Sequence, residues 1–88
     1  GVSIEEELTI DDYISIYPNP SNGQFSISLE HNENTSIVVF NPVGKEVLSD
    51  DYNNTNKINV DLRDYKKGVY FVKVTIGDMI YNKKIVYQ

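Results

Sequence analysis

The sequence predicts an all-β domain, a sandwich of about seven short antiparallel strands, from three observations. Apolar residues recur with period two from Tyr13 onward, which is the periodicity of strands with one buried face. Turn residues recur about every 8–12 residues, a spacing typical of β-sandwiches. The chain has 88 residues, of which 40% are apolar, and this is enough for one domain with a thin two-layer core.

The first three predicted strands come from alternation and from the turns between them. Residues 13–17 form a short strand that ends at Pro18, because proline has no N–H for the sheet. Residues 24–30 alternate apolar and polar side chains, as a strand with one wet face does. Residues 31–34 are polar and predict a turn. Residues 35–40 are apolar on both faces, which predicts a central strand.

The next elements follow from turn chemistry. Residues 41–44, Asn-Pro-Val-Gly, predict a three-residue hairpin loop whose glycine takes a positive φ. Residues 45–52 are expected to be a strand, and residues 51–56 a polar connection. Residues 58–62 alternate again and predict a strand, and residues 64–68 are a turn that a glycine closes.

The chain ends in a predicted β-hairpin. The β-rich runs 68–76 and 79–88 flank Gly77 and Asp78, and a glycine in first place is typical of a type II′ turn. A two-residue loop pairs Ile76 with Met79, Val74 with Tyr81, Val72 with Lys83, and Tyr70 with Ile85. Lys83 is the charged residue on this apolar face. Either a bulge near residues 82–84 shifts the register, or Lys83 extends to water at the rim of the sandwich.

Composition and charge exclude several classes of function. The net charge is −5 and all eight Lys and Arg residues follow residue 44, so nucleic acid, which needs a dense cationic face, is not an expected partner. There is no cysteine, hence no disulfide framework and no thiolate chemistry. No apolar run approaches the roughly 18 residues of a membrane span, and no signal peptide opens the chain. Residues 1–12 are predicted to be an acidic flexible linker, and residues 13–88 the folded domain.

The sequence offers little for catalysis. His31 is the only histidine and lies in a polar segment, whereas a Ser–His–Asp arrangement needs all three groups held by rigid neighbours. Ser28 and Ser36 are near in sequence, but they fit the wet face of a strand. Asp50 and Asp51 are adjacent and fit solvated surface charge better than a pair of glycosidase carboxylates. We therefore expect no enzymatic activity.

No cofactor or metal is expected either. Asp51, Asn53 and Thr55 have the spacing of the first oxygen ligands of a calcium loop, but Asn56 and Leu62 stand where an EF-hand needs Gly and Glu. Structural calcium in another loop geometry stays open.

Exposed aromatic residues could instead form a platform for sugar rings. The candidates are Tyr13, Tyr52, Tyr65, Phe71 and Tyr87. In the hairpin register above, Phe71 points outward, opposite Lys84. Aromatic residues on β-sandwiches more often pack in the core or across strands.

Four blocks of sequence, in order, resemble one known family. They are Tyr-Pro-Asn-Pro-Ser-Asn-Gly at residues 17–23, the block with the Asn-Pro-Val-Gly-Lys turn at 39–47, Leu62 with Gly-Val-Tyr-Phe-Val-Lys-Val at 68–74, and Lys-Lys-Ile-Val at 83–86. This pattern resembles the type A C-terminal sorting domain of the type IX (Por) secretion system of Bacteroidetes. One departure is Gln88, since that family frequently ends in lysine.

The resemblance implies a seven-stranded Ig-like sandwich that closes a larger secreted protein and carries its N-terminal cargo from the periplasm through the outer membrane. It implies as partners a shuttle β-barrel of the outer membrane, the translocon and a sortase-type cysteine protease that removes the domain, leaving the cargo at the cell surface or secreted. The recognition residues carried over by position are Lys83, Lys84, Ile85, Val86, Tyr87 and Gln88. The residues expected to be structural are Pro18, Asn19, Pro20, Gly44, Gly68 and Tyr70.

Two alternatives remain open at this stage. The domain could be an accessory carbohydrate-binding or adhesive module of a secreted enzyme, which would use the aromatic residues above. It could also dimerise, because a sandwich has open edges at which strands of two copies can pair.

Overall fold

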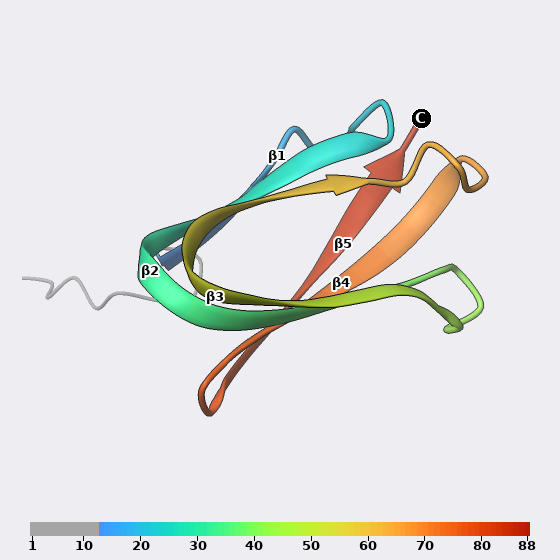
Figure 1. The fold of residues 1–88 in the computed structure, drawn as a ribbon. Coiled ribbons are helices and arrows are strands. Elements are labelled where there is room, and N and C mark those ends of the chain that lie inside the picture. Colours follow the sequence, from blue (N-terminus) through green and yellow to red (C-terminus); the bar gives the residue numbers. More distant parts are fainter. Residues whose placement is uncertain (1–12) are drawn as a thin grey trace, which may run out of the picture.

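The computed structural model describes residues 13–88, and the predicted linker of residues 1–12 lies outside the described residues. Five antiparallel strands form one sheet that curls into a half-barrel (Figure 1). The strands are β1 (Ile14–Tyr17), β2 (Gln24–Phe40), β3 (Glu46–Asp61), β4 (Gly68–Ile76) and β5 (Met79–Tyr87). The prediction of an all-β domain is therefore confirmed.

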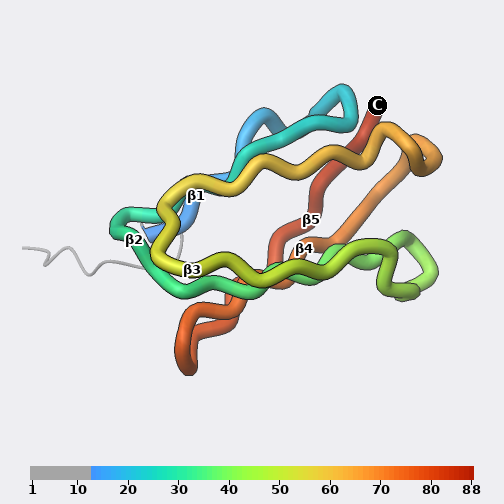
Figure 2. Tube along the Cα trace, viewed as in Figure 1, coloured from blue at the N-terminus to red at the C-terminus, as the bar shows by residue number. Residues whose placement is uncertain are grey.

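The long strand β2 is the centre of the sheet, and it bends. β3 pairs with both halves of β2 along one edge. On the other edge, the first half of β2 pairs with β1 and the second half with β4, and β5 pairs with β4. β2 and β3 turn together at one end of the molecule (Figure 2). Their two halves therefore lie in opposite walls of the curl.

The prediction of seven strands in an Ig-like sandwich is not what the structure shows. Residues 31–34 were expected to be a turn and residues 51–56 a connection, but both segments are strand. The β2–β3 register shifts between Ser28 and Glu33 and again between Glu33 and Thr35. Such bulges bend a strand without ending it. Two pairs of predicted strands therefore merge into the two long bent strands.

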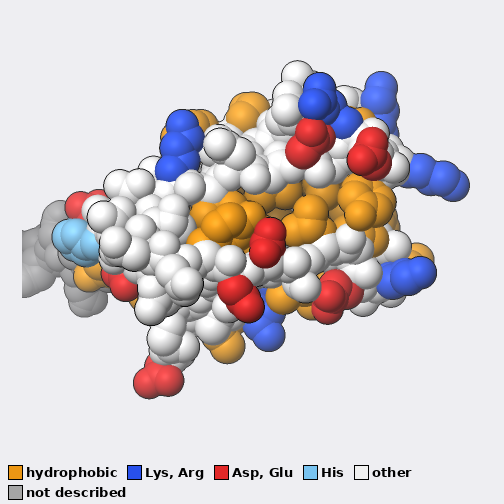
Figure 3. Space-filling view, viewed as in Figure 1, with side chains coloured by type: hydrophobic (Ala, Val, Ile, Leu, Met, Phe, Trp, Pro, Cys, Tyr) orange, Lys and Arg blue, Asp and Glu red, His pale blue; other side chains and the backbone are white. Residues whose placement is uncertain are grey.

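The core fills the inside of the curl. Alternation places Phe25, Ile27 and Leu29 there, at 2%, 0% and 6% exposure, as the sequence predicted. The other buried apolar residues are Ile14, Ile37, Val39, Ile58, Val60, Leu62, Tyr70, Val72, Val74, Tyr81, Ile85 and Tyr87. Because the curled sheet does not close, hydrophobic side chains are visible between the two halves of β3, with acidic side chains beside them (Figure 3).

The β2–β3 hairpin has the predicted three-residue loop. The N–H of Asn41 donates to the Lys45 carbonyl at 2.9 Å, and the N–H of Gly44 donates to the Asn41 carbonyl at 2.9 Å. The Asn41 Oδ1 accepts from the N–H groups of Val43 at 3.1 Å and Lys45 at 2.9 Å. Gly44 has φ +87°, a conformation that glycine adopts without steric cost.

The β4–β5 hairpin has the predicted register. Ile76 pairs with Met79, Val74 with Tyr81, Val72 with Lys83, and Tyr70 with Ile85. Gly77 has φ +60°, and Asp78 is not among the residues with positive φ, which together fit a type II′ turn.

Two tyrosines fix the crossing from β3 to β4. The Tyr70 hydroxyl donates to the carbonyl of Lys66, four residues upstream, as in the tyrosine corner of Greek-key sandwiches. The Tyr65 hydroxyl donates to the Val47 carbonyl at 2.9 Å. Burial, followed by the charges of Tyr87 and Tyr65, raises the pKa of Tyr70. Gly68 begins β4 with φ +150°.

Candidate functional site at the terminal strand

The residues predicted to be recognised all lie on or directly after β5. Ile85 and Tyr87 point into the core and are buried, whereas Lys84 and Gln88 are exposed and Val86 is half-buried. This is the alternation of a strand with one face on the core. The terminal segment is therefore part of the fold and also presents side chains at the surface.

Lys83 resolves the ambiguity in the sequence. The β4–β5 ladder runs through it without a register shift, and it pairs with Val72 on the inner face. A bulge near residues 82–84, which the sequence left open, is therefore excluded. Lys83 is nevertheless exposed, since β5 is at the edge of the sheet and a long side chain can reach water from there. Within residues 13–88, the lysines of β5 form no ion pair.

The Pro-Asn-Pro segment that precedes β2 lies beside β5. The Asn19 Nδ2 donates to the carbonyl of Lys84 at 2.9 Å, and the Asn19 Oδ1 accepts from the N–H of Val86 at 3.0 Å. These residues are 65 and 67 positions apart in sequence. Pro18 and Pro20, each with a cis peptide bond before it, flank Asn19 and are exposed.

Ser21 continues this contact through its main chain. Its N–H donates to the Val86 carbonyl at 2.8 Å, and its carbonyl accepts from the N–H of Gln88 at 2.9 Å. Ser21 and Tyr87 thereby form a parallel bridge. Ser21 is only 5% exposed, and its hydroxyl accepts from the Gly23 N–H at 3.2 Å. The edge of β5 is thus occupied from residue 84 to residue 88.

Gly23 is where the ring of Tyr87 packs against the chain. A Cβ added at Gly23 would stand 2.9 Å from Cε1 and Cζ of Tyr87 and 2.8 Å from Cγ of Arg63, and Gly23 has φ +105°. The Gly23 carbonyl accepts from the Leu62 N–H at 2.7 Å. Any side chain at this position would force Arg63 and the Tyr87 ring to shift.

The structure thus brings the Pro-Asn-Pro motif into contact with the terminal strand. Asn19, which the sequence marked as structural, contacts two of the predicted recognition residues, Lys84 and Val86, directly. Ser21 and Gly23 belong to the same motif, but sequence reasoning gave them no role. The signal that could have found Gly23 is its place beside polar turn residues, where glycine indicates a positive φ. No comparable signal marks Ser21.

The residues examined for catalysis do not form a catalytic group. The Ser36 hydroxyl donates to Asp51 Oδ1 at 2.7 Å, while His31 is an exposed residue on the bend of β2. In residues 13–88, no group of three His, Cys, Asp or Glu side chains could hold a metal ion. The calcium-loop candidates lie in β3, where the Thr55 hydroxyl donates to the Lys57 carbonyl at 3.3 Å.

The aromatic candidates differ in exposure. Tyr13 and Tyr52 are partly buried against the core. Tyr87 is buried, and Tyr65 uses its hydroxyl in the contact with Val47. Burial and the neighbouring Asp50 carboxylate raise the pKa of Tyr52. Phe71 points outward from β4, is 44% exposed, and pairs with Phe40 on one side and Lys84 on the other. It is the exposed aromatic residue nearest the terminal strand in the sheet register.

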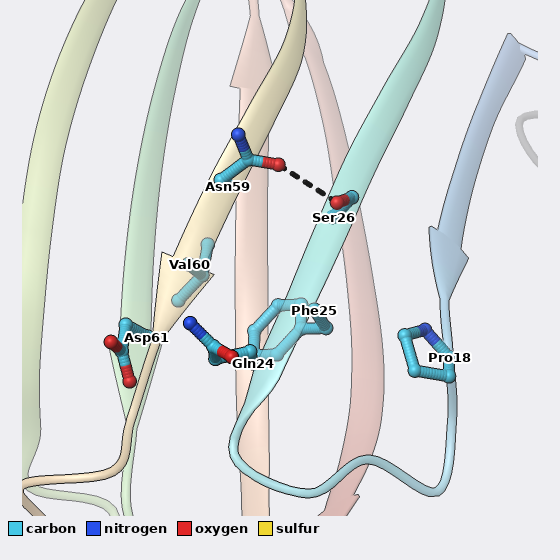
Figure 4. Close-up of a pocket in the computed structure, with 7 residues that line it drawn as sticks. All are labelled: Pro18, Gln24, Phe25, Ser26, Asn59, Val60 and Asp61. Atoms are coloured by element: carbon cyan, nitrogen blue, oxygen red, sulfur yellow. Dashed lines mark hydrogen bonds between the residues drawn. The ribbon is translucent and has the colours of Figure 1, made fainter.

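The surface hollows are small. One of about 290 Å³ is lined by residues of β2 and β3 together with Pro18, and its Ser26 hydroxyl donates to Asn59 Oδ1 at 2.8 Å (Figure 4). At its end, Asp61 pairs with Arg63 at 2.9 Å, and this hydrogen-bonded guanidinium lowers the pKa of Asp61. A hollow of this size is at the lower limit for a ligand site, and its Ser26 and Asp61 side chains already have partners in Asn59 and Arg63.

The fold and the site define a small all-β domain in which an N-terminal motif holds the final strand. The chain belongs to the family of secretion system C-terminal sorting domains, those of the Por or type IX system, and the family model matches residues 15–88. A sorting-signal domain is not a catalyst. Membership implies contact with the secretion machinery and with a fused cargo, and secretion or display at the cell surface.

Two relatives are much longer proteins. The chain is 22% identical over 87 residues to an endo-acting ulvan lyase of Formosa agariphila, covering 98% of this chain and 17% of that protein. It is 31% identical over 75 residues to an ulvan lyase, NLR42, of Nonlabens ulvanivorans, covering 83% of this chain and 14% of that protein. The chain thus spans less than a fifth of either relative.

No helix in residues 13–88 is long and apolar enough to cross a membrane.

Proposed function

We propose that residues 83–88 are the element by which the type IX machinery recognises this domain and directs its cargo across the outer membrane. The observation that carries this proposal is the terminal strand itself. Ile85 and Tyr87 anchor it in the core, while Lys83, Lys84 and Gln88 stay exposed. Strand addition to residues 84–88 is blocked by residues 19–21. A receptor therefore reads the exposed side chains.

The partners proposed are those that the family resemblance implied. A shuttle β-barrel of the outer membrane binds the folded domain, the translocon passes it from the periplasm, and a sortase-type cysteine protease removes it. Cleavage is proposed to fall in or before residues 1–12, which lie outside the described residues. The cargo then remains at the cell surface or is secreted.

The relatives support a proposal about the cargo. Both carry names of ulvan lyases and are several times longer than this chain. We propose that the cargo joined to this domain is an enzyme that acts on a polysaccharide. The domain itself supplies the route and not the catalysis.

Charge reversal at the terminal strand tests the recognition role. The whole chain is fused behind a neutral reporter that needs the domain for export. Export is measured as the amount of reporter in the medium and on the cell surface. Lys83→Glu with Lys84→Glu is expected to reduce export at least tenfold, since two cations that a receptor can pair become anions. These side chains are exposed and form no ion pair within residues 13–88, so the fold is retained.

The matched control uses the other adjacent pair of exposed lysines. Lys66→Glu with Lys67→Glu makes the same change of charge in the turn before β4, beside the end of β5 but outside residues 83–88, and export is expected to remain within twofold of the wild type. Deletion of residues 84–88 is a poorer test because it also removes Ile85 and Tyr87 from the core. Equal export by both charge-reversed fusions would rule out recognition of Lys83 and Lys84.

The exposed ring of Phe71 gives the carbohydrate-binding alternative its own test. A ring that is 44% exposed could stack on a sugar. Retention of the domain on a polysaccharide column, lost in Phe71→Ala with unchanged export, would establish a second function. Absence of retention would leave sorting as the function of this surface.

A further inference from the structure

The side chain of Asn19 takes the place of a neighbouring strand. A primary amide has a carbonyl acceptor and an N–H donor in one plane, as a peptide group does. Asn19 uses both, donating to the Lys84 carbonyl at 2.9 Å and accepting from the Val86 N–H at 3.0 Å. These are the groups to which another strand would bond.

The backbone of β5 explains why these groups need a partner. Successive residues of a strand direct their N–H and C=O groups to opposite edges. The groups of Lys84, Val86 and Gln88 bond to residues 19–21, so they face away from β4. Asn19 covers the first part of this stretch, and the main chain of Ser21 covers the rest. Together the two residues serve as a short substitute strand.

The position of this contact matters because β5 is at an edge of the sheet, with β4 as its neighbour in the strand order. A strand at an edge can open locally without global unfolding. One edge of the terminal segment is held by β4. Without Asn19, the Lys84 carbonyl and the Val86 N–H would lose their partners on the other edge, which would keep only the bonds of Ser21 to Val86 and Gln88.

We propose that Asn19 is the positioning residue of the sorting signal. Its amide keeps residues 84–88 extended and bound to the sheet, which is the form that the machinery reads. This inference rests on the proposed function, in which residues 83–88 are recognised. The exposed Pro-Asn-Pro segment then affects export only by positioning the terminal strand, without contacting the machinery itself.

Asn19→Ala tests the proposal through amide hydrogen exchange and export. In the variant, protection of the Val86 amide is expected to fall at least tenfold. The Val72 amide, in the fully buried part of β4, is expected to keep wild-type protection. Export of the reporter fused to the whole chain is expected to fall at least fivefold, because the frayed tail presents its side chains in many arrangements.

Asn41→Ala is the control for general damage to the fold. Like Asn19, Asn41 makes two side-chain bonds to the backbone. Its Oδ1 accepts both, at 3.1 and 2.9 Å, and they lie in the β2–β3 turn. Asn22→Ala is a second control in the same segment, since the Asn22 Oδ1 accepts from the Gln24 N–H at 3.3 Å and not from β5. Both controls are expected to leave Val86 protection and export within twofold of the wild type.

Several outcomes would overturn the proposal. Unchanged protection of Val86 in Asn19→Ala would show that Ser21 alone holds the strand. Faster exchange with wild-type or increased export would show that the machinery reads an open tail. An equal loss of export in Asn41→Ala would reduce Asn19 to a general structural role. If the Lys83 and Lys84 reversal leaves export intact, the proposed recognition fails, whereas the exchange result still decides whether Asn19 positions the strand.

Discussion

Replacing Gly23 by alanine should destabilise the domain more than a positive φ alone explains. At φ +105° an alanine is strained, which costs about 1–3 kcal/mol. Its Cβ would also stand 2.9 Å from the ring of Tyr87. It would also stand 2.8 Å from Cγ of Arg63. Tyr87 is 8% exposed and its strand is held by Ser21, so the ring has little room to move. Forcing an extra group into such packing adds about 1–3 kcal/mol.

The expected total loss in the free energy of unfolding is therefore about 2–6 kcal/mol. This is a large share of the roughly 4–13 kcal/mol typical of a chain of this length. Urea unfolding followed by circular dichroism measures it. Gly44→Ala separates the two contributions, because Gly44 has φ +87° and nothing lies within 4 Å of an added Cβ. That variant is expected to lose only the part due to backbone strain.

A second background isolates the contact with Tyr87. In a Tyr87→Leu chain the ring is absent, so the cost of Gly23→Ala should fall towards the cost of Gly44→Ala, with the contact to Arg63 Cγ remaining. The steric reasoning would be refuted if the cost of Gly23→Ala were the same in both backgrounds. It would also fail if Gly23→Ala cost no more than Gly44→Ala in the wild-type chain.

Three further predictions concern stability. Ile85→Ala removes a side chain with 0% exposure and should cost about 2–5 kcal/mol in urea unfolding; a loss below 1 kcal/mol would contradict the buried position. Asp61→Asn breaks an ion pair in which the Arg63 and Asp61 side chains are 57% and 49% exposed, so the urea midpoint should stay the same within error; a clear loss of stability would contradict this. Burial raises the pKa of Tyr70 above the ordinary value of 10.0. The stability that this shift contributes is complete below that pH and is lost as the pH rises through the folded-state pKa. Unfolding at about pH 8 and pH 11 should show a smaller alkaline loss in Tyr70→Phe than in the wild type, and equal losses would disprove this contribution.

The terminal hairpin could be predicted in detail because its determinants are local. A two-residue loop fixes which residues face each other, so Gly77 and Asp78 set the register of the whole β4–β5 ladder. Period two then assigned Tyr70 and Ile85 to the core, where they lie. Only the position of the Lys83 ammonium needed the structure, because it depends on β5 being at an edge.

The number of strands could not be predicted because a bend and a break have the same sequence signature. Polar residues at 31–34 and 51–56 satisfy a solvated turn as well as an exposed bulge. In the structure these segments pair with each other: Glu33 is opposite Thr55, and the Asn54 N–H donates to Asn34 Oδ1 at 2.9 Å. Asn54 has φ +48°, which asparagine tolerates better than most residues. The chain therefore turns while its backbone groups stay paired.

The candidate site was found in pieces for a similar reason. The sequence marked Asn19 and the residues of β5 separately, through the family resemblance. It did not reveal that they touch, because periodicity describes faces of a strand and says nothing about which loop covers its edge. The contact spans 65–67 residues, and only the curl of the sheet brings the two segments together.

The alternation of β5 would let the same few residues stabilise the fold and carry the proposed signal. Ile85 and Tyr87 occupy the core, while Lys84 before them and Gln88 after them stay exposed on the outer face, and β4 and residues 19–21 hold the two edges. The exposed side chains have a defined spacing only while this strand is in place. A shift of one residue would exchange the inner and outer sets. A receptor that requires the outer set thus binds the folded domain in preference to an unfolded tail, so that folding of the domain and export of its cargo become coupled.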